Sequence, residues 1–219
     1  MPSIIRSDNR DFESFFQTLL LAKREDSPDV DATVAQIISD VRELGDAAVI
    51  DLTEQFDGIA LTPDTMAFSE SEINEEISKV TVEEAEALQI AADRIRAYHE
   101  RQLPEDASWE DETGAMLGWR WTPVDAAGLY VPGGTASYPS SVLMNAIPAQ
   151  VAGVKELSIC CPTPGGQINP LVLLAAQISG VDTIYRIGGA QAIAALAYGT
   201  ESIAKVDKIT GPGNAFVAA

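Results

Sequence analysis

Hydrophobic residues recur every three or four positions along the first half of the chain, which is the spacing of amphipathic α-helices. Residues 11–22 carry three phenylalanines and two leucines on one helical face, so we expect a helical arm that needs a partner surface. That surface is either the rest of the chain or a second subunit. The same spacing predicts a helix over residues 34–44 and another that resumes after Gly45-Asp46 and ends at Asp57-Gly58.

Two capping-box spacings mark the starts of two further helices. Ser69 stands three residues before Glu72, and Thr81 stands three residues before Glu84. In a capping box, the first side chain accepts a hydrogen bond from the backbone N–H of the glutamate, and the glutamate carboxylate accepts one in return. We therefore expect the segment before residue 103 to be mostly helical.

Strand-forming residues become common after that segment. Residues 104–124 are expected to form a β-hairpin, because tryptophans at alternate positions follow a Thr-Gly pair. From residue 125 onward, four short β-type runs each lead through a loop of small residues into a helical pattern. The expected strands are 127–131, 157–161, 183–187 and 208–210, and the expected helices are 140–152, 169–178, 191–198 and 214 onward.

This repeat of roughly 25 residues is typical of βα units in a parallel sheet. We therefore predict the α/β fold class, with a helical N-terminal region and a β-hairpin followed by a Rossmann-like parallel sheet. In such sheets, ligands bind at the carboxyl ends of the strands.

The charge of the chain excludes several kinds of partner. The formal net charge is −19, from 33 acidic and 14 basic residues, which would repel nucleic acid and anionic membranes. No run approaches the roughly 20 apolar residues of a membrane span, and the N-terminus has no basic segment followed by an apolar one. Adjacent cysteines such as Cys160 and Cys161 rarely form a disulfide with each other. Free thiols of this kind fit a reducing compartment. We therefore predict a cytoplasmic protein without nucleic-acid or membrane partners.

Glycine-containing loops follow three of the predicted strands, at residues 132–135, 188–191 and 211–214. Glycine allows backbone N–H groups to approach a pyrophosphate closely. None of these loops matches G-x-G-x-x-G with an acidic residue about 20 positions later. A dinucleotide would therefore bind by another arrangement, or the glycines only form tight strand-to-helix turns.

Three polar residues are expected at the same edge of the sheet as these loops. Tyr130 ends the first strand, Gln191 begins a helix, and Asn214 begins the last helix, where capping the helix is its default role. Together these side chains can converge on one ligand, although each alone is more often structural.

Residues for metal or acid–base chemistry are scarce. His99 is the only histidine, and its position on a helical face favours local packing or hydrogen bonding. The chain has no C-x-x-C or H-x-x-x-H spacing and no clustered Asp, Glu and His residues. Cys160 and Cys161 lack a basic neighbour that would activate a thiol, so we expect them in a buried strand. We therefore assign no catalytic residue and no metal ligand within this chain.

Longer sequence blocks carry a resemblance to a known family. They are VRELGD at 41–46, QFDG at 55–58, GLYVPGG at 128–134, SVLM at 141–144, IGGAQAIAALAYGT at 187–200 and VDKITGPGN at 206–214. In their residues, order and spacing, these blocks resemble histidinol dehydrogenase. The resemblance extends from the N-terminal arm to Ala219, and the block at 187–200 is far more specific than a short glycine motif.

The resemblance implies a zinc-dependent enzyme of histidine biosynthesis that oxidises L-histidinol to L-histidine through histidinal, consuming two NAD. It implies NAD contacts from Tyr130, Gln191 and Asn214, with Pro132 and Pro212 flanking the site. Zinc would hold the substrate's amine and imidazole nitrogens, and a Glu–His pair would act as base. The family forms intertwined homodimers, so the resemblance also implies a homodimer.

The resemblance further implies that the chain is an N-terminal half, with the zinc ligands and the base expected C-terminal to Ala219. We accordingly divide it into an N-terminal helical arm (1–27), the first part of a discontinuous α/β domain (28–124) and a nucleotide-binding domain that is incomplete at its C-terminus (125–219). We expect this chain alone to be inactive. The alternatives are a non-catalytic fragment or NAD-binding module, and a sibling dehydrogenase of another amino or sulfonated alcohol.

Overall fold

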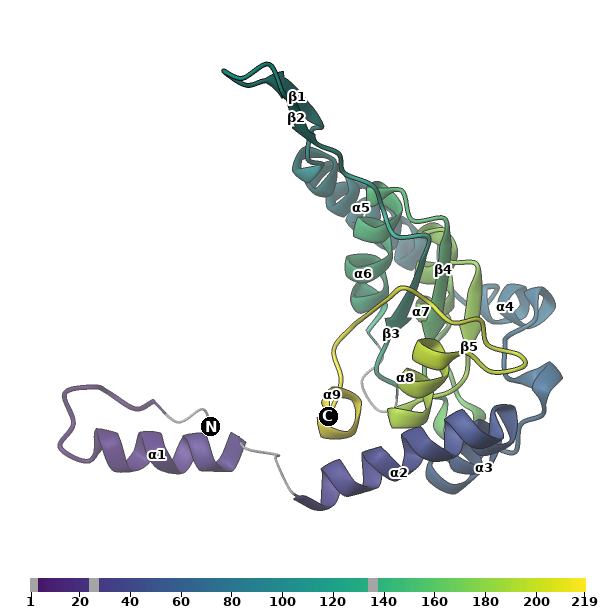
Figure 1. Ribbon diagram of the computed structural model, residues 1–219. Helices are drawn as coiled ribbons and strands as arrows, with labels where there is room; N and C mark the ends of the chain where they lie inside the picture. The colour runs from purple at the N-terminus through teal and green to yellow at the C-terminus, as the bar shows by residue number, and fades with distance from the viewer. Residues whose placement is uncertain (1–3, 24–27, 134–137) are drawn as a thin grey trace.

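The fold is built on a parallel four-stranded sheet, as the computed structural model shows for residues 4–23, 28–133 and 138–219 (Figure 1). The strand order is β5-β4-β3-β6, and all neighbouring strands are parallel. The strands are β3 (Ala126–Tyr130), β4 (Glu156–Cys160), β5 (Thr183–Tyr185) and β6 (Lys208–Thr210). All four predicted strands are thus confirmed, and so is the predicted fold class.

The strand expected at residues 183–187 is shorter in the structure, where β5 ends at Tyr185. On the open edge of β5, the backbone N–H of Arg186 donates to the carbonyl of Met66 at 2.8 Å, and the N–H of Phe68 donates to the carbonyl of Ile184 at 2.9 Å. Ala67 pairs with Tyr185 in an isolated antiparallel bridge. A segment from the N-terminal region therefore pairs with the open edge of β5.

Helices follow the strands in the second half of the chain as predicted. They are α6 (Pro139–Ala152), α7 (Pro170–Ile178), α8 (Gly189–Tyr198) and α9 (Ala215–Ala218), with a short 3-10 turn η3 (Pro164–Gly166). The loop predicted at residues 132–135 is described only up to Gly133.

Helices also dominate the first half. They are α1 (Phe12–Lys23), α2 (Pro28–Leu44), α3 (Asp46–Asp57), α4 (Glu70–Ile77) and α5 (Val82–His99), with 3-10 turns η1 (Pro63–Thr65) and η2 (Glu100–Gln102). Both predicted capping boxes are present, at Ser69 with Glu72 and at Thr81 with Glu84. The predicted end of α3 is confirmed by Gly58, whose positive φ of 66° closes the helix.

The predicted hairpin is formed by β1 (Ala107–Glu110) and β2 (Met116–Trp119), which pair antiparallel. Trp109 and Trp119 meet edge to face with their ring centroids 5.1 Å apart. The hairpin extends away from the sheet, beyond the end of α5 (Figure 1). Its tryptophans remain largely exposed.

Two hydrophobic cores cover the two faces of the sheet. Because side chains alternate along a strand, Leu129 packs on one face with α5, α6 and α7, and Tyr130 packs on the other with α2, α3 and α8. Cys160 and Cys161 likewise belong to opposite cores. Helices from before residue 124 therefore share both cores with the sheet, and the proposed division into domains stays a prediction.

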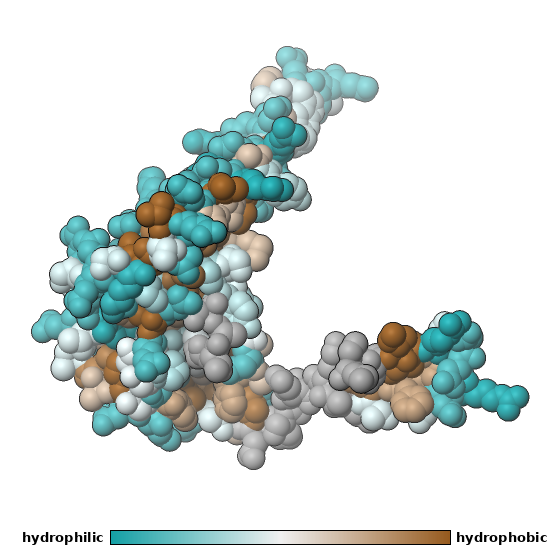
Figure 2. Space-filling model, turned by 180° about the vertical axis from the view of Figure 1, so that it is seen from behind, coloured by the Kyte–Doolittle hydropathy of each residue, from teal (hydrophilic) through white to brown (hydrophobic). Residues whose placement is uncertain are grey.

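The predicted N-terminal helix is confirmed as α1, which lies apart from the sheet and its covering helices (Figure 1). Phe12 and Phe16 stack with their centroids 5.6 Å apart. Its apolar face is exposed, with Phe15 at 54% and Leu19 at 43%, and Figure 2 shows apolar side chains at the surface of this arm.

Candidate site at the carboxyl edge of the sheet

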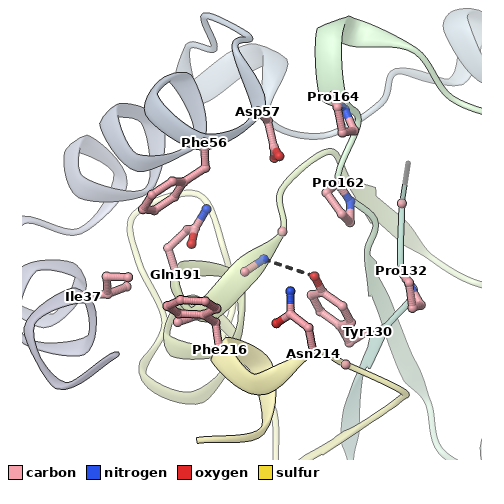
Figure 3. A pocket seen from close by; sticks show the side chains of 15 residues that line it. Ile37, Phe56, Asp57, Tyr130, Pro132, Pro162, Pro164, Gln191, Asn214 and Phe216 are labelled. Carbon is pink, nitrogen blue, oxygen red and sulfur yellow. Dashed lines mark hydrogen bonds between the residues drawn. The ribbon is translucent and has the colours of Figure 1, made fainter. Parts of the chain in front are cut away.

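A cavity of about 380 Å³ opens at the carboxyl ends of the strands (Figure 3). Four strand-to-helix connections and the helices α2 and α3 form its wall. The described lining residues are Ile37, Phe56, Asp57, Tyr130, Pro132, Gly133, Pro162, Pro164, Gly188, Gly189, Ala190, Gln191, Gly213, Asn214 and Phe216. Ligands bind in this region of open parallel sheets.

Four of the five residues singled out from the sequence meet in this cavity. Tyr130, Pro132, Gln191 and Asn214 all line it, from the end of β3 and its loop, the first turn of α8 and the start of α9. Pro212 is not among the lining residues, but its neighbour Gly213 is. The structure therefore brings the predicted polar groups together, and their role in cofactor binding stays a prediction.

Tyr130 is fixed at the base of the cavity. It is 5% exposed, and its hydroxyl accepts a hydrogen bond from the backbone N–H of Gly189 at 3.1 Å. Burial raises the pKa of the Tyr130 hydroxyl above its usual value, so the phenol stays protonated at neutral pH. This hydrogen bond joins the end of β3 to the start of α8.

Gln191 lies in the first turn of α8 and is 1% exposed. Its Oε1 atom is buried and has no hydrogen-bond partner among the described residues. The carboxamide lies against Gly189, which has a φ of 64° and where a Cβ atom would come 2.6 Å from Oε1. A buried acceptor without a partner is costly, so a hydrogen-bond donor from a ligand would stabilise it.

Asn214 caps the last helix, as expected from its position. Its side-chain oxygen accepts a hydrogen bond from the backbone N–H of Val217 at 3.2 Å. Figure 3 shows this side chain beside the ring of Tyr130. Capping fixes the carboxamide at the cavity wall, so the structural role does not conflict with a binding role.

The glycines of two loops have a packing role in this structure. A Cβ atom on Gly133 would come 2.0 Å from the carbonyl oxygen of Pro162, and one on Gly188 would come 2.4 Å from the Pro162 ring. Glycine therefore allows the loops after β3, β4 and β5 to converge. This is a packing role between loops rather than the tight turn considered from the sequence, and the convergence itself forms the cavity.

Sequence reasoning missed the contribution of α3 and α9 to this cavity. Phe56 and Phe216 line it with rings that are 54% and 41% exposed, and Asp57 points into it (Figure 3). The Oδ2 atom of Asp57 is buried without a hydrogen-bond partner, and burial raises the pKa of this carboxyl. The QFDG block at 55–58 was the available signal, but locally it indicates only the end of a helix.

The other chemically reactive residues lie outside the cavity lining. His99 accepts or donates one local hydrogen bond, from Nδ1 to the side-chain oxygen of Gln102 at 2.6 Å, as expected. Cys160 and Cys161 are buried free thiols, and burial raises the pKa of Cys161 to about 12. Over residues 4–23, 28–133 and 138–219, no group of three or more His, Cys, Asp and Glu side chains could hold a metal ion. In the same ranges no helix is both long and apolar enough to cross a membrane.

A family model described as histidinol dehydrogenase matches residues 21–219. The chain belongs to the histidinol dehydrogenase family. This confirms the resemblance drawn from the sequence blocks, and it places the cavity in a region that members of the family share.

Named relatives and a solved structure agree with this assignment. The histidinol dehydrogenases of Ruegeria pomeroyi and Cereibacter sphaeroides are 71% and 67% identical over all 219 residues, which are 51% and 50% of those proteins. The crystal structure of histidinol dehydrogenase from Elizabethkingia anophelis matches 87% of this chain and 44% of its own chain, with a TM-score of 0.83 and 38% identity. The chain therefore spans about half the length of the curated relatives it matches.

Proposed function

We propose that this chain forms the NAD-binding part of a histidinol dehydrogenase, a cytoplasmic oxidoreductase that converts L-histidinol to L-histidine through histidinal. The observation that carries the proposal is the convergence of Tyr130, Pro132, Gln191 and Asn214 on one cavity in a chain of this family. We also propose, from the family resemblance, that the whole protein is a homodimer.

The cavity fits a nucleotide in three respects. Gln191 offers a buried acceptor without a partner, which suits the amide or hydroxyl donors of NAD. Phe56 and Phe216 present partly exposed rings, which can stack on a planar base. The cavity volume of about 380 Å³ lies in the ordinary range for ligand pockets.

When bound, NAD supplies a hydride acceptor, while the protein binds and orients it. We expect Gln191 and Asn214 to hold the cofactor by their carboxamides. Tyr130 keeps the Gly189 backbone in place, and Pro132 with the aromatic rings excludes water from the cavity. These residues position the cofactor and exclude water from it, and none of them is expected to move a proton.

The described residues do not fit a zinc site. Zinc requires three or four ligands from cysteine, histidine or carboxylate side chains, and the described part of the chain has no such group. We expect the zinc ligands and the Glu–His base from the part of the relatives' length that this chain does not span.

The proposal is tested by titrating NAD into the 219-residue chain and into Gln191→Ala and Asn214→Ala variants by calorimetry. Loss of one hydrogen bond is expected to weaken binding roughly threefold to tenfold. Gln89→Ala is a matched control, because Gln89 lies exposed on α5 and outside the cavity lining. Unchanged affinity in both cavity variants would count against the site.

A further inference from the structure

One carboxylate in the cavity is not explained by the contacts that hold the fold together. Asp57 is the last residue of α3, and Gly58 closes the helix directly after it. The Oδ2 atom of Asp57 is buried and has no hydrogen-bond partner among the described residues. Figure 3 shows the side chain directed into the cavity, opposite Tyr130 and Asn214.

The position of Asp57 is unfavourable for a negative charge in two ways. Taking a carboxylate oxygen out of water without a partner is costly. The carboxyl end of a helix also carries a partial negative charge, and Asp57 lies at that end of α3. An unfavourable charge held at a cavity wall is typical of a group that acts on a ligand.

The charge of the cavity limits what this ligand can present to Asp57. Among the described lining residues, Asp57 is the only charged side chain, and no lysine, arginine or histidine lines the cavity. A phosphate near Asp57 would therefore meet a carboxylate and a helix carboxyl end, without a cation to offset them. A hydroxyl group there would instead donate to Oδ2 and satisfy it.

We propose that Asp57 selects the cofactor, accepting hydrogen bonds from the ribose hydroxyls of NAD and rejecting the ribose phosphate of NADP. This inference rests on the proposed NAD site. In Rossmann folds, an acidic residue about 20 positions after the glycine loop binds the ribose 2′-hydroxyl. None of the glycine loops of this chain has the full G-x-G-x-x-G pattern that such a residue accompanies. Asp57 supplies a carboxylate from a different part of the sequence, because α3 packs against α8.

The test compares NAD and NADP affinities by calorimetry for the 219-residue chain and its Asp57→Asn variant. The unchanged chain is expected to bind NADP at least about tenfold more weakly than NAD. Asp57→Asn is expected to weaken NAD binding about threefold to tenfold, because a charge-assisted hydrogen bond becomes neutral. NADP binding should not weaken, so the preference for NAD should fall by a similar factor.

Controls separate this role from a structural one and from a general charge effect. Asp51→Asn removes the same charge from an exposed position on α3 and should leave both affinities unchanged. Asp57→Asn should also keep or raise the thermal midpoint, because it removes the charge of a carboxylate whose buried oxygen has no partner among the described residues. Asp57→Ser provides a second uncharged variant in case the first does not fold.

The outcomes distinguish the two proposals. If the unchanged chain binds NAD but binds NADP equally well, or if the preference for NAD persists in both Asp57 variants, the role of Asp57 is wrong while the NAD site stands. If the unchanged chain binds neither nucleotide, the proposed function fails and this inference fails with it.

Discussion

The hydroxyl of Tyr130, at the end of β3, accepts a hydrogen bond from the backbone N–H of Gly189, at the start of α8, at 3.1 Å. Gly189 has a positive φ of 64°, and the carboxamide of Gln191 lies against it. One tyrosine therefore fixes the backbone on which the buried glutamine depends. Binding and folding are linked at this point of the cavity.

Tyr130→Phe is expected to destabilise the chain by about 1 kcal/mol, because the backbone N–H of Gly189 loses its buried acceptor. NAD affinity should fall in the same variant. Urea denaturation and calorimetry measure the two effects. Tyr198→Phe is the control, since Tyr198 lies at the other end of α8 from Gly189 and has 51% of its surface exposed. Equal stability of Tyr130→Phe and the unchanged chain would contradict this role of the hydroxyl.

The carboxylate of Asp46 differs from that of Asp57, because Asp46 is buried and its hydrogen bonds are satisfied. Asp46, which is 7% exposed at the start of α3, accepts hydrogen bonds from the hydroxyls of Thr200 and Ser202 and from the Ser202 backbone N–H. In return, the Asp46 backbone N–H donates to the Glu201 carboxylate at 2.9 Å. These bonds attach the junction of α2 and α3 to the loop after α8.

Asp46→Ala is therefore expected to destabilise the chain by about 3 kcal/mol, because buried hydroxyls and an N–H lose a charged acceptor. Chemical denaturation measures the change. Asp51→Ala, on the exposed side of the same helix, should cost less than about 0.5 kcal/mol. A similar loss in both variants would show that the network around Asp46 contributes little.

The ion pair between Arg186 and Glu72, at 2.8 Å, joins the end of β5 to α4. The pKa of Glu72 is lowered to about 2, first by the Ser69 backbone N–H and then by Arg186. A carboxyl with a lowered folded-state pKa stabilises the fold fully above its unfolded value, near 4.5, and less as the pH falls toward 2. The side chain of Glu72 is 45% exposed, so solvent screens much of this effect.

Glu72→Gln should thus destabilise the chain by roughly 0.5–1 kcal/mol at pH 7, and the difference should shrink as the pH falls from 4.5 to 2. Denaturation midpoints across this pH range measure it. Glu75→Gln, on the exposed surface of α4, is the matched control for the removal of one carboxylate from this helix. A difference for Glu72→Gln that stays constant with pH would contradict the lowered pKa.

Local signals in the sequence predicted the elements well, because the residues that end or begin a helix lie within a few positions of it. The Ser69 and Glu72 pair at the start of α4 and Gly58 at the end of α3 are signals of this kind. The pairing of the open edge of β5 was not predictable in this way. It includes the hydrogen bond from Arg186 to Met66, and the sequence around Arg186 gives no sign of that partner.

The same distinction explains which cavity residues could be predicted. Tyr130 ends a parallel strand, and Gln191 and Asn214 come soon after two others, so their meeting at one edge is a consequence of the topology. Asp57 reaches that edge only because α3 packs on α8, which is a tertiary contact. A residue at a helix end far from any glycine loop carries no local mark of a cofactor site.

The 219-residue chain is expected to produce no NADH from L-histidinol with added zinc. Its only histidine, His99 at the end of α5, is hydrogen-bonded to Gln102 and lies outside the cavity lining. Burial raises the pKa of Tyr130, so its hydroxyl stays protonated. Apart from Asp57, which we propose to bind the cofactor ribose, no described cavity residue carries a group that could act as the base. The Ruegeria pomeroyi histidinol dehydrogenase, in the same absorbance assay, serves as the positive control. Turnover by this chain of order 1 per second would contradict the expectation and would place catalysis within residues 1–219.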